Sequence, residues 1–348
     1  MTPFRTLVFA LLLILGSSGQ ALAQQPDPRM LGMVITNPEL GSYDRSLETA
    51  LSAGVTRVPL TFFWSSLEPA PGQYDDSVLA VAALYYPALG LTVDLAVSPI
   101  ATNRLVVPED LQARALDDPE VIQRYLALLD HVLEILEDAH VETLLLGVEV
   151  DAWLGEDAAA WRSYTALTAA AASHVHRTHP GIELGVQSTT YSRLATPANW
   201  ETIDEVSDFV ATSYFPMDGM NVRDPSVVAD DFAALTQLYP NRVIRVVEAG
   251  FPSSRANGSS PELQAAFVHA LFAIWDEYAT QIVSITLSIE HDYSPSAVSQ
   301  IQRFYGDPRP EYAAYMGSIG LRSWHRYGEP KPAWIALIQE TSAREWVV

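Results

Sequence analysis

The sequence predicts a single-domain α/β protein, a closed (β/α)8 or TIM barrel, and three observations indicate it. From Met30 onward, short apolar runs alternate with longer segments of helical period, which gives eight strand-then-helix units in roughly 320 residues. No Pro-, Gly- or Ser-rich linker is long enough to separate two domains. The first strand is followed by Thr36-Asn37-Pro38-Glu39 and not by a glycine-rich dinucleotide-binding turn. An open, doubly wound sheet is the alternative.

The eight predicted strands are runs of apolar, often β-branched residues that are too short for helices. Gly54, Gly90 and Gly181 each precede one of them, as expected of residues that end a helix or form a loop. The strands are predicted at Leu31–Thr36, Thr56–Phe62, Leu91–Val97, Thr143–Glu149, Ile182–Gln187, Phe209–Thr212, Val243–Val247 and Ile282–Leu287.

The helices between them are predicted from apolar residues at helical spacing. Asp118-Pro119-Glu120 and Ser260-Pro261-Glu262 are helix starts, each with a polar N-cap and proline at the first helical position. The segment from Pro197 to Val206 shows the weakest pattern. The helices are predicted at Tyr43–Ala53, Val78–Leu89, Pro119–Ala139, Asp157–Thr178, Pro225–Leu238 and Pro261–Tyr278.

The N-terminus has the pattern of a secretory signal peptide. Arg5 precedes the apolar run Leu7–Leu15, and Ala21-Leu22-Ala23 fits a cleavage site, so we expect cleavage after Ala23. An uncleaved anchor fits less well, because the apolar run is far shorter than the ~20 residues that span a bilayer. The sequence therefore predicts a secreted or periplasmic protein with a signal peptide (1–23), a short leader (24–29) and one barrel domain (30–348).

Charge and composition limit the partners. The 348-residue chain carries a formal charge of −22, which repels nucleic acid and anionic membrane surfaces. A neutral oligo- or polysaccharide fits such a surface. Cysteine is absent, so disulfides cannot stabilise the fold. We expect no cofactor and no metal, and composition does not determine the oligomeric state.

Two glutamates are the strongest candidates for chemistry. Glu149 follows the apolar run Leu144–Leu146, and Glu248 follows Val243–Val247. A carboxylate at the edge of an apolar core is costly, although capping or ion pairing could explain a single one. In a barrel both would lie at the C-terminal ends of strands, where active sites form. A pair of carboxylates on one pocket is the arrangement of a glycosidase.

Several motifs add a resemblance to a known group. Arg57-Val58-Pro59-Leu60-Thr61-Phe62-Phe63-Trp64, Gly328-Glu329-Pro330-Lys331-Pro332-Ala333-Trp334 and the two glutamate segments resemble the retaining (β/α)8 glycosidases. Asp208-Phe209-Val210-Ala211-Thr212-Ser213-Tyr214-Phe215-Pro216 and Val247-Glu248-Ala249-Gly250-Phe251-Pro252 resemble strands six and seven of arabinogalactan endo-β-1,4-galactanases. The resemblance covers nearly the whole mature chain.

The resemblance implies a secreted retaining glycoside hydrolase that cleaves β-linked sugars by double displacement. Glu149 would be the acid/base and Glu248 the nucleophile, with Asp151 a weaker candidate for the acid. One departure stands out: Val148 occupies the position where the group usually has an asparagine that binds the sugar 2-OH. The alternative is therefore a catalytically impaired barrel that binds carbohydrate without turnover.

Further residues are candidates for substrate binding. Arg57 would fix Glu248 or its neighbours in the manner of the group's strand-two arginine, and a surface ion pair is the alternative. Tyr214 would donate its hydroxyl to Glu248, and a core aromatic with its hydroxyl at the surface is the alternative. Glu290 could contact sugar hydroxyls. Aromatic side chains near predicted strand ends could stack on sugar rings, although core packing is the ordinary explanation for each. These aromatic candidates are Trp64, Trp153, Phe251 and Trp324.

Overall fold

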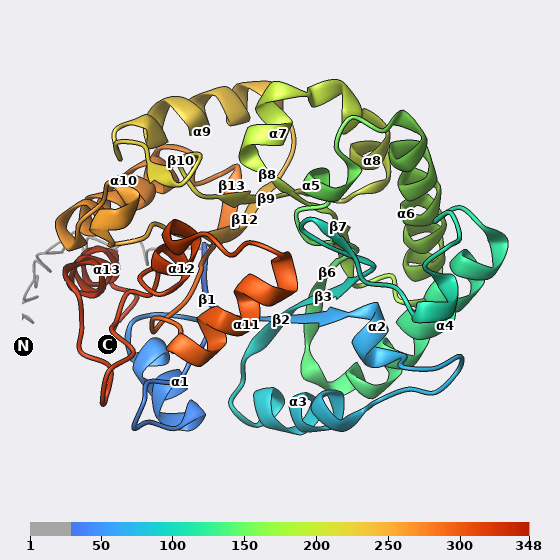
Figure 1. The fold of residues 1–348 in the computed structure, drawn as a ribbon, viewed down its shortest axis with the longest axis horizontal. Helices are drawn as coiled ribbons and strands as arrows, with labels where there is room; N and C mark the ends of the chain where they lie inside the picture. The colour runs from blue at the N-terminus through green and yellow to red at the C-terminus, as the bar shows by residue number, and fades with distance from the viewer. Residues whose placement is uncertain (1–28, 348) are drawn as a thin grey trace, which may run out of the picture.

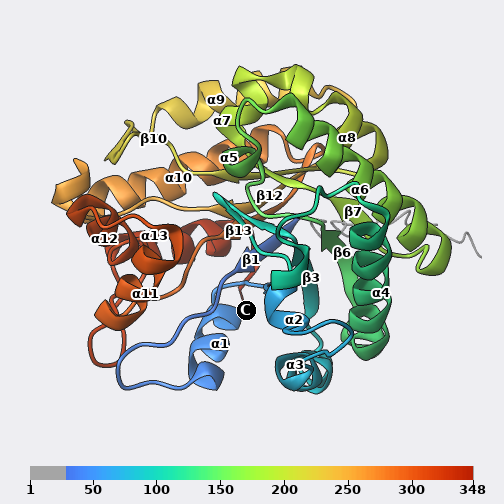
Figure 2. The same ribbon diagram turned by 45° about the vertical axis from the view of Figure 1, so that its right-hand side comes forward.

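The computed structural model describes residues 29–347, so the predicted signal peptide and residues 24–28 of the leader lie outside the described part. Strands and helices alternate around a parallel sheet that closes on itself (Figure 1). The prediction of a single-domain TIM barrel is confirmed. Figure 2 shows the helices arranged in a ring outside the sheet.

The sheet contains nine strands in the order β7-β6-β3-β2-β1-β13-β12-β9-β8. The predicted fifth strand is present as two pieces, β7 and β8, which are separated by Val186. Because β7 pairs with β6 and β8 pairs with β9, these two pieces close the barrel. The strands are β1 (Met30–Met33), β2 (Arg57–Phe63), β3 (Thr92–Ser98), β6 (Val141–Leu145), β7 (Glu183–Gly185), β8 (Gln187–Thr189), β9 (Val210–Tyr214), β12 (Ile244–Ala249) and β13 (Ile282–Leu287).

The outer helices begin where the sequence predicted them, within two residues. Asp118 caps its helix by accepting from the Glu120 backbone N–H, and Ser260 accepts from that of Leu263. The segment with the weakest pattern forms a 3-10 turn and a short helix, α8. The helices outside the barrel mouth are α1 (Tyr43–Ser52), α3 (Ser77–Ala88), α4 (Pro119–Ile135), α6 (Ala158–Thr178), α8 (Glu201–Val206), α9 (Val227–Leu238), α10 (Pro261–Glu277) and α13 (Pro332–Ala343).

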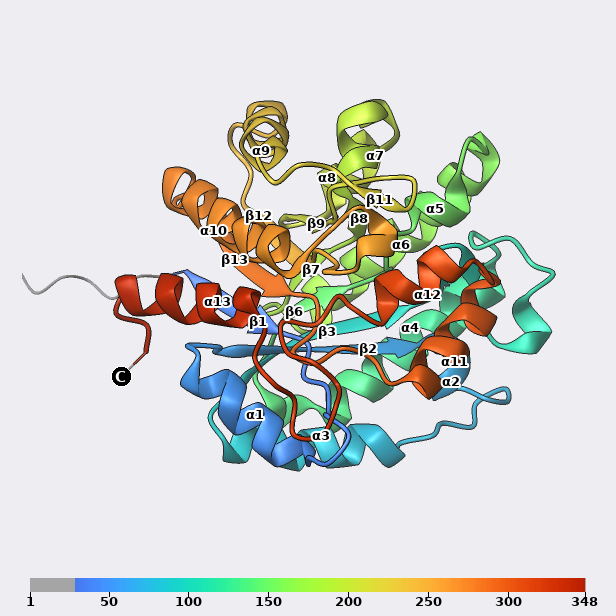
Figure 3. The same ribbon diagram turned by 60° about the vertical axis from the view of Figure 1, so that its left-hand side comes forward.

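Short elements follow the C-terminal ends of the strands. Figure 3 shows the β2 arrow pointing toward α2, with α11 and α12 at the same end of the barrel. They are α2 (Trp64–Leu67), α5 (Asp151–Leu154), α7 (Thr190–Ala195), α11 (Pro295–Tyr305), α12 (Pro310–Met316) and the hairpins β4–β5 (Ile100–Ala101, Arg104–Leu105) and β10–β11 (Met217–Asp218, Asn221–Val222).

Alternation along the strands divides the apolar residues into two layers. The larger layer lies between sheet and helices and contains Val210 and Tyr214 of β9. A smaller cluster with Phe209 and Ala211 forms the other layer, on the barrel interior. Because successive residues of a strand face opposite sides, Ser213 shares the interior face with Ala211. This alternation decides which side chains of a strand face the barrel interior and which face the helices.

No helix within residues 29–347 is both long enough and apolar enough to cross a membrane.

Candidate active site

A cavity of about 500 Å³ opens at the C-terminal ends of the strands, and both Glu149 and Glu248 line it. The two glutamates belong to strands four and seven of the barrel, so segments about 100 residues apart in sequence meet here. Val148 also faces this cavity. The remaining lining residues are Thr102, Asn103, Thr189, Phe215, Met217, Gly219, Met220, Ser288, Tyr293, Ile301, Tyr305, Asp307, Tyr312, Tyr315, Met316 and Ile319.

The backbone at Glu149 is strained. The strand was predicted to run to Glu149, but β6 ends at Leu145. Glu149 has a φ of +44°, in the left-handed region that residues other than glycine rarely adopt. Gly147 makes the approach to this turn possible, because a Cβ there would lie 2.4 Å from the Tyr164 hydroxyl. The turn brings the Glu149 carboxyl group to the cavity.

Two hydroxyl groups hold the Glu149 carboxyl group. Ser213 Oγ donates to Glu149 Oε1 at 2.5 Å, and Thr102 Oγ1 donates to Oε2 at 3.2 Å. Burial raises the pKa of Glu149, and both hydrogen bonds oppose that shift because they favour the charged form. Glu149 therefore lies in an environment that favours a proton-carrying carboxyl group.

Glu248 reaches the cavity through an irregularity in β12. The register with β9 shifts between Val246 and Glu248, so Val247 is an extra residue in the strand, as in a β-bulge. Val247 packs against the barrel-interior cluster and the next residue, Glu248, lines the cavity. Neighbours in a regular strand face opposite sides, so the bulge allows both to point inward.

The Glu248 carboxyl group accepts from Ser288 Oγ at 3.1 Å and from Gln187 Nε2 at 3.4 Å. Burial, and then the charge of Glu149, raise the pKa of Glu248 to about 7. When one carboxylate of such a pair is ionised, the other holds its proton more strongly. No Lys, Arg or His is among the described residues that line the cavity, so cationic side chains do not offset this repulsion.

The wall opposite the strands is rich in tyrosine, and sequence reasoning missed it. Tyr293, Tyr305, Tyr312 and Tyr315 all come from the segment between β13 and α13, which contains α11 and α12. The one available signal was the length of this segment, because long loops after barrel strands carry active-site residues. Thr102, Gln187, Ser213 and Ser288, which bind the two carboxyl groups, were also missed.

The prediction that Arg57 fixes Glu248 is wrong. Arg57 is the first residue of β2, and its guanidinium donates to Asp94 and to Glu142, 2.6 Å from Glu142 Oε2. Both acceptors lie near the N-terminal ends of their strands, away from the active-site mouth. Arg57 therefore belongs to an ion-pair network at the opposite end of the barrel, in which Arg57 is buried and Glu142 is exposed.

Tyr214, Trp64 and Phe251 face the helix layer and not the cavity. Tyr214 donates to Asp231 Oδ2 at 2.9 Å, so its predicted bond to Glu248 is absent. Trp64 is completely buried and donates from Nε1 to Glu68 at 2.7 Å. Phe251 is 1% exposed, and its ring lies 5.1 Å from that of Phe267. Burial removes Trp64 and Phe251 as stacking platforms for sugars.

The other candidates lie outside the cavity that Glu149 and Glu248 line. Trp153 is half-buried beside α6, and Trp324 lines a separate depression beside α11. Glu290 is fully buried, and neither of its carboxyl oxygens has a hydrogen-bond partner among the described residues. Asp151 accepts from the backbone N–H and hydroxyl of Thr189, at 2.9 and 2.7 Å, which uses its carboxylate to fix the loop after β8.

Among residues 29–347, no three or more His, Cys, Asp or Glu side chains form a group that could hold a metal ion.

Comparisons with solved structures support the barrel fold. Neither family models nor curated proteins give a match to this sequence. The exo-beta-1,4-mannosidase Op5Man5 from Opitutaceae bacterium strain TAV5 is similar with a TM-score of 0.70 at 15% identity, over 91% of this chain and 59% of that one. A GH5_18 variant from Streptomyces cattleya, in complex with Manb1-4GlcNAc, gives 0.65 at 16% identity over 91% and 81%. The Ignisphaera aggregans GH53 catalytic domain gives 0.63 at 16% over 90% and 97%.

Proposed function

We propose that this protein is a retaining glycoside hydrolase that acts on β-linked sugars. The observation that carries the proposal is the pair Glu149 and Glu248, on the turn after strand four and near the C-terminal end of strand seven, which line one cavity and interact electrostatically. Retaining glycosidases need two carboxyl groups that face one sugar, one ionised and one protonated. The similar solved structures are glycoside hydrolases on the same fold.

In the first step the Glu248 carboxylate attacks the anomeric carbon and forms an ester bond to it. The glycosidic C–O bond breaks, and the proton of Glu149 moves to the departing oxygen. The reaction requires the proton of the pair on Glu149 and an ionised Glu248 when attack begins, and the positive charge that develops on the sugar ring then stabilises the ionised form of Glu248.

In the second step water attacks the same carbon while Glu149 accepts its proton, and the ester bond to Glu248 breaks. Two displacements at one carbon retain the anomeric configuration. The net reaction consumes one water for each glycosidic bond.

The cavity favours an uncharged sugar. Glu149, Glu248 and Asp307 are its acidic lining residues, and they would repel a uronic acid or a phosphorylated sugar. The four tyrosines provide apolar ring faces for the C–H surface of a pyranose and hydroxyl groups for its oxygens. A neutral β-linked oligosaccharide is therefore the substrate class.

A second candidate function is carbohydrate binding without turnover. Val148 faces the cavity at the position of the missing asparagine, and no cationic side chain lines the cavity near Glu248. Both features weaken stabilisation of the transition state. If they prevent turnover, Glu149→Gln and wild type bind oligosaccharides alike and neither releases product, while Val148→Asn introduces activity.

The experiment is a substrate panel of β-1,4-linked manno-, gluco- and galacto-oligosaccharides and Manβ1-4GlcNAc. The galacto-oligosaccharides are included because strands six and seven resemble those of galactanases. The manno-oligosaccharides and Manβ1-4GlcNAc are included because the similar structures are a mannosidase and a complex with Manb1-4GlcNAc. We expect product with retained configuration, and loss of at least about a thousandfold in kcat for Glu248→Gln. A 2-fluoro sugar inactivator should label Glu248.

Glu149→Gln should lose most activity on oligosaccharides, whose leaving group needs a proton. The matched control is Glu134→Gln, an exposed position on α4, which should behave as wild type. If both active-site glutamine variants hydrolyse every accepted substrate at the wild-type rate, the catalytic assignment is wrong.

The proposal also places the enzyme outside the cytoplasm, in the medium or the periplasm. The support is the pattern of Arg5, the run Leu7–Leu15 and Ala21-Leu22-Ala23. N-terminal sequencing of the protein recovered from the expressing cell tests it: the mature chain should begin at Gln24 in the exported fraction.

A further inference from the structure

A second cavity of about 270 Å³ adjoins the catalytic cavity. The two share Thr189, Phe215 and Met217 as lining residues, so they lie side by side. The walls of the second cavity come from α7 and from the segments that follow β9. Its other lining residues are Thr190, Tyr191, Leu194, Ser213, Tyr214, Pro216, Arg223 and Asp231.

The second cavity lies on the Glu149 side of the catalytic pair. Ser213, which donates to Glu149 Oε1 at 2.5 Å, is one of its lining residues. Glu248 and its partners Ser288 and Gln187 are not. A general acid must lie beside the oxygen that leaves, so a substrate extends past the acid on its leaving-group side.

A hydrogen-bonding group is already assembled in this cavity. The Arg223 guanidinium binds Asp231 through both terminal nitrogens, at 2.8 and 3.2 Å, and the Tyr214 hydroxyl donates to the same carboxylate at 2.9 Å. The ion pair is neutral as a unit, and the Arg223 side chain is 38% exposed. Its remaining N–H groups are able to donate to the hydroxyls of an uncharged sugar.

An aromatic side chain stands at the edge of this cavity. Tyr191 is the second residue of α7 and is 78% exposed, in contrast to Trp64 and Phe251, which pack inside the protein. An exposed aromatic ring beside hydrogen-bond donors is the arrangement that binds a pyranose, because a sugar ring has an apolar C–H face and a polar edge.

We infer that this second cavity is the subsite for the sugar on the leaving-group side of the scissile bond, with Tyr191 as stacking platform and Arg223 as hydroxyl donor. The inference rests on the proposed hydrolase function and deepens it by assigning the residues that bind the leaving-group sugar of the oligosaccharide.

The test compares two substrates that share the cleaved sugar and differ in the leaving group. One is the β-linked tetrasaccharide that the substrate panel identifies, and the other is the β-glycosyl fluoride of the same sugar. Fluoride leaves without filling the second cavity and needs little help from an acid. We expect Tyr191→Ala to lower kcat/KM for the tetrasaccharide about tenfold relative to the fluoride, a loss of about 1.4 kcal/mol of binding.

Arg223→Met should show the same selective loss, and its unfolding midpoint in urea reports whether the unpaired Asp231 has damaged the fold. Tyr327→Ala is the matched control, because Tyr327 is also an exposed tyrosine, at 65%, and lines neither cavity. Tyr327→Ala should leave the ratio of kcat/KM for the tetrasaccharide to kcat/KM for the fluoride at the wild-type value.

Three results have distinct meanings. A selective loss with the tetrasaccharide supports the subsite. If wild type hydrolyses both substrates and Tyr191→Ala and Arg223→Met leave their ratio unchanged, the subsite is wrong and the hydrolase function stands. If wild type hydrolyses neither the fluoride nor the tetrasaccharide, the hydrolase function is wrong, and with it the assignment of a leaving-group side.

Discussion

Ser213 and Glu149 are joined by a 2.5 Å hydrogen bond that connects strand β9 to the turn after β6. Ser213 is buried and faces the barrel interior, while its neighbour Tyr214 faces the helices. The donor therefore reaches the proposed acid across the interior of the barrel. This bond favours the ionised form of Glu149, whereas burial favours the protonated form.

Ser213→Ala should move the alkaline limb of the kcat/KM profile to higher pH. The variant lacks the hydroxyl that stabilises the ionised Glu149 carboxylate, so the pKa at which the carboxyl pair releases its last proton rises. Activity is therefore lost at a higher pH. We expect kcat at the optimum to stay within about tenfold of wild type, because Ser213 contacts the acid and not the reacting bond. The measurement is a pH–rate profile from pH 4 to 9.

Ser52→Ala, at an exposed position on α1, is the control for this profile. A shift of the alkaline limb to lower pH in Ser213→Ala would contradict the electrostatic account of the pair.

The segment with α11 and α12 is anchored to the loops on the other side of the mouth. Asn103 Nδ2 donates to the Tyr305 backbone oxygen at 3.1 Å, Arg104 donates to that of Phe304, and the Phe304 ring stacks on Phe63 at 5.5 Å. Tyr305 and Tyr312 line the cavity from this segment. The anchor therefore fixes the position of the tyrosine wall.

Arg104→Ala should raise KM severalfold and change kcat little. The variant loses a hydrogen bond and the contact of the guanidinium with the Phe304 ring, which together contribute about 1–2 kcal/mol to keeping the segment in place. Steady-state kinetics on the best oligosaccharide measure the effect, and limited proteolysis between α11 and α12 reports the loosened anchor. Arg303→Ala is the control, because Arg303 is exposed on α11 next to Phe304. This variant should change neither KM nor the rate of proteolysis.

The positions of the two glutamates were predictable because a buried parallel strand is a short apolar run, and the residue after it lies at the active end of a barrel. The phase of a strand was not predictable. All five residues of β9 are buried, so hydrophobicity does not distinguish the face of Tyr214 from the face of Ser213. Hence Tyr214 was predicted to donate to Glu248, whereas its neighbour Ser213 is the residue that faces the barrel interior, where it donates to Glu149.

Two other features depend on contacts between distant segments. The bulge at Val247 appears only in the pairing of β12 with its neighbours, and the sequence around it reads as a regular strand. The tyrosine wall depends on Asn103 and Phe63, which lie about 200 and about 240 residues before Tyr305. No local pattern encodes such a contact. Arg57 was misplaced because the motif resemblance was given more weight than the predicted strand Thr56–Phe62, which puts Arg57 at the N-terminal end, away from the barrel mouth.

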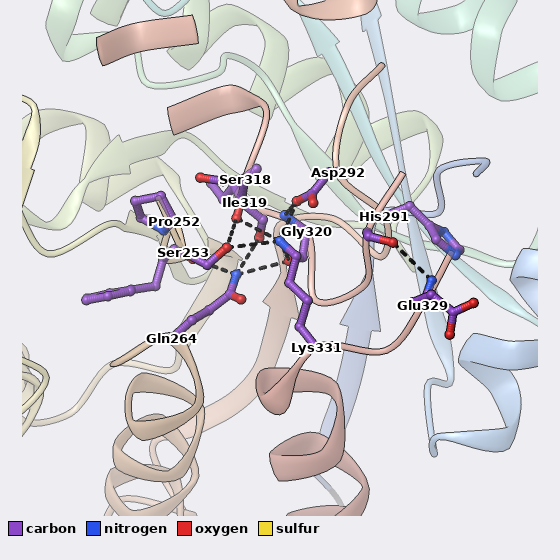
Figure 4. A network of polar contacts seen from close by, with 12 residues as sticks. Pro252, Ser253, Gln264, His291, Asp292, Ser318, Ile319, Gly320, Glu329 and Lys331 are labelled. Carbon is purple, nitrogen blue, oxygen red and sulfur yellow. Dashed lines mark hydrogen bonds and ion pairs between the residues drawn. The ribbon is translucent and has the colours of Figure 1, made fainter. Parts of the chain in front are cut away.

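Lys331 is the centre of a polar network that connects the segments after β12, β13 and α12 (Figure 4). Its ammonium group donates to Asp292 Oδ1 at 2.6 Å, Ser253 Oγ at 3.1 Å and the backbone oxygens of Ser318 and Gly320 at 3.0 and 2.8 Å. Burial lowers the pKa of Lys331 and raises that of Asp292 to about 6. The network thus holds the loop that brings Ile319 to the cavity.

Lys331→Met should lower the free energy of unfolding by about 3–5 kcal/mol, because it leaves Asp292 buried without its cation. Urea denaturation at pH 7 measures the loss. The double variant Lys331→Met/Asp292→Asn should recover part of the stability, since the amide carries no charge. Equal losses in the single and double variants would show that the charge of Asp292 is unimportant, contrary to this explanation.

Glu290 provides a test of how a buried acid controls stability against pH. Its side chain is fully buried, its two oxygens have no hydrogen-bond partner among the described residues, and burial raises its pKa to about 8. Arg322 opposes the shift through its charge, while the nearby His291 is kept neutral by a pKa lowered to about 4. The folded protein is therefore more stable when Glu290 is protonated than when it is ionised.

The sign of the pH effect follows from the raised pKa. The unfolded chain releases this proton near pH 4.5, and the folded protein keeps it until about pH 8. The contribution of Glu290 to stability is therefore complete below pH 4.5 and is lost as the pH rises through 8. Glu248 and Asp292, with pKa values raised to about 7 and about 6, act in the same direction.

Glu290→Gln resembles the protonated side chain at every pH, so it should be more stable than wild type at pH 9 and similar to it at pH 4.5. We expect the difference at pH 9 to be at least about 1 kcal/mol, since each unit of pKa shift corresponds to about 1.4 kcal/mol. Unfolding in urea at pH 4.5, 7 and 9 measures it. Glu277→Gln, exposed at the end of α10, is the control. A stability difference between Glu290→Gln and wild type that is the same at all three pH values would contradict this account, because the effect of residue 290 would then not depend on its ionisation.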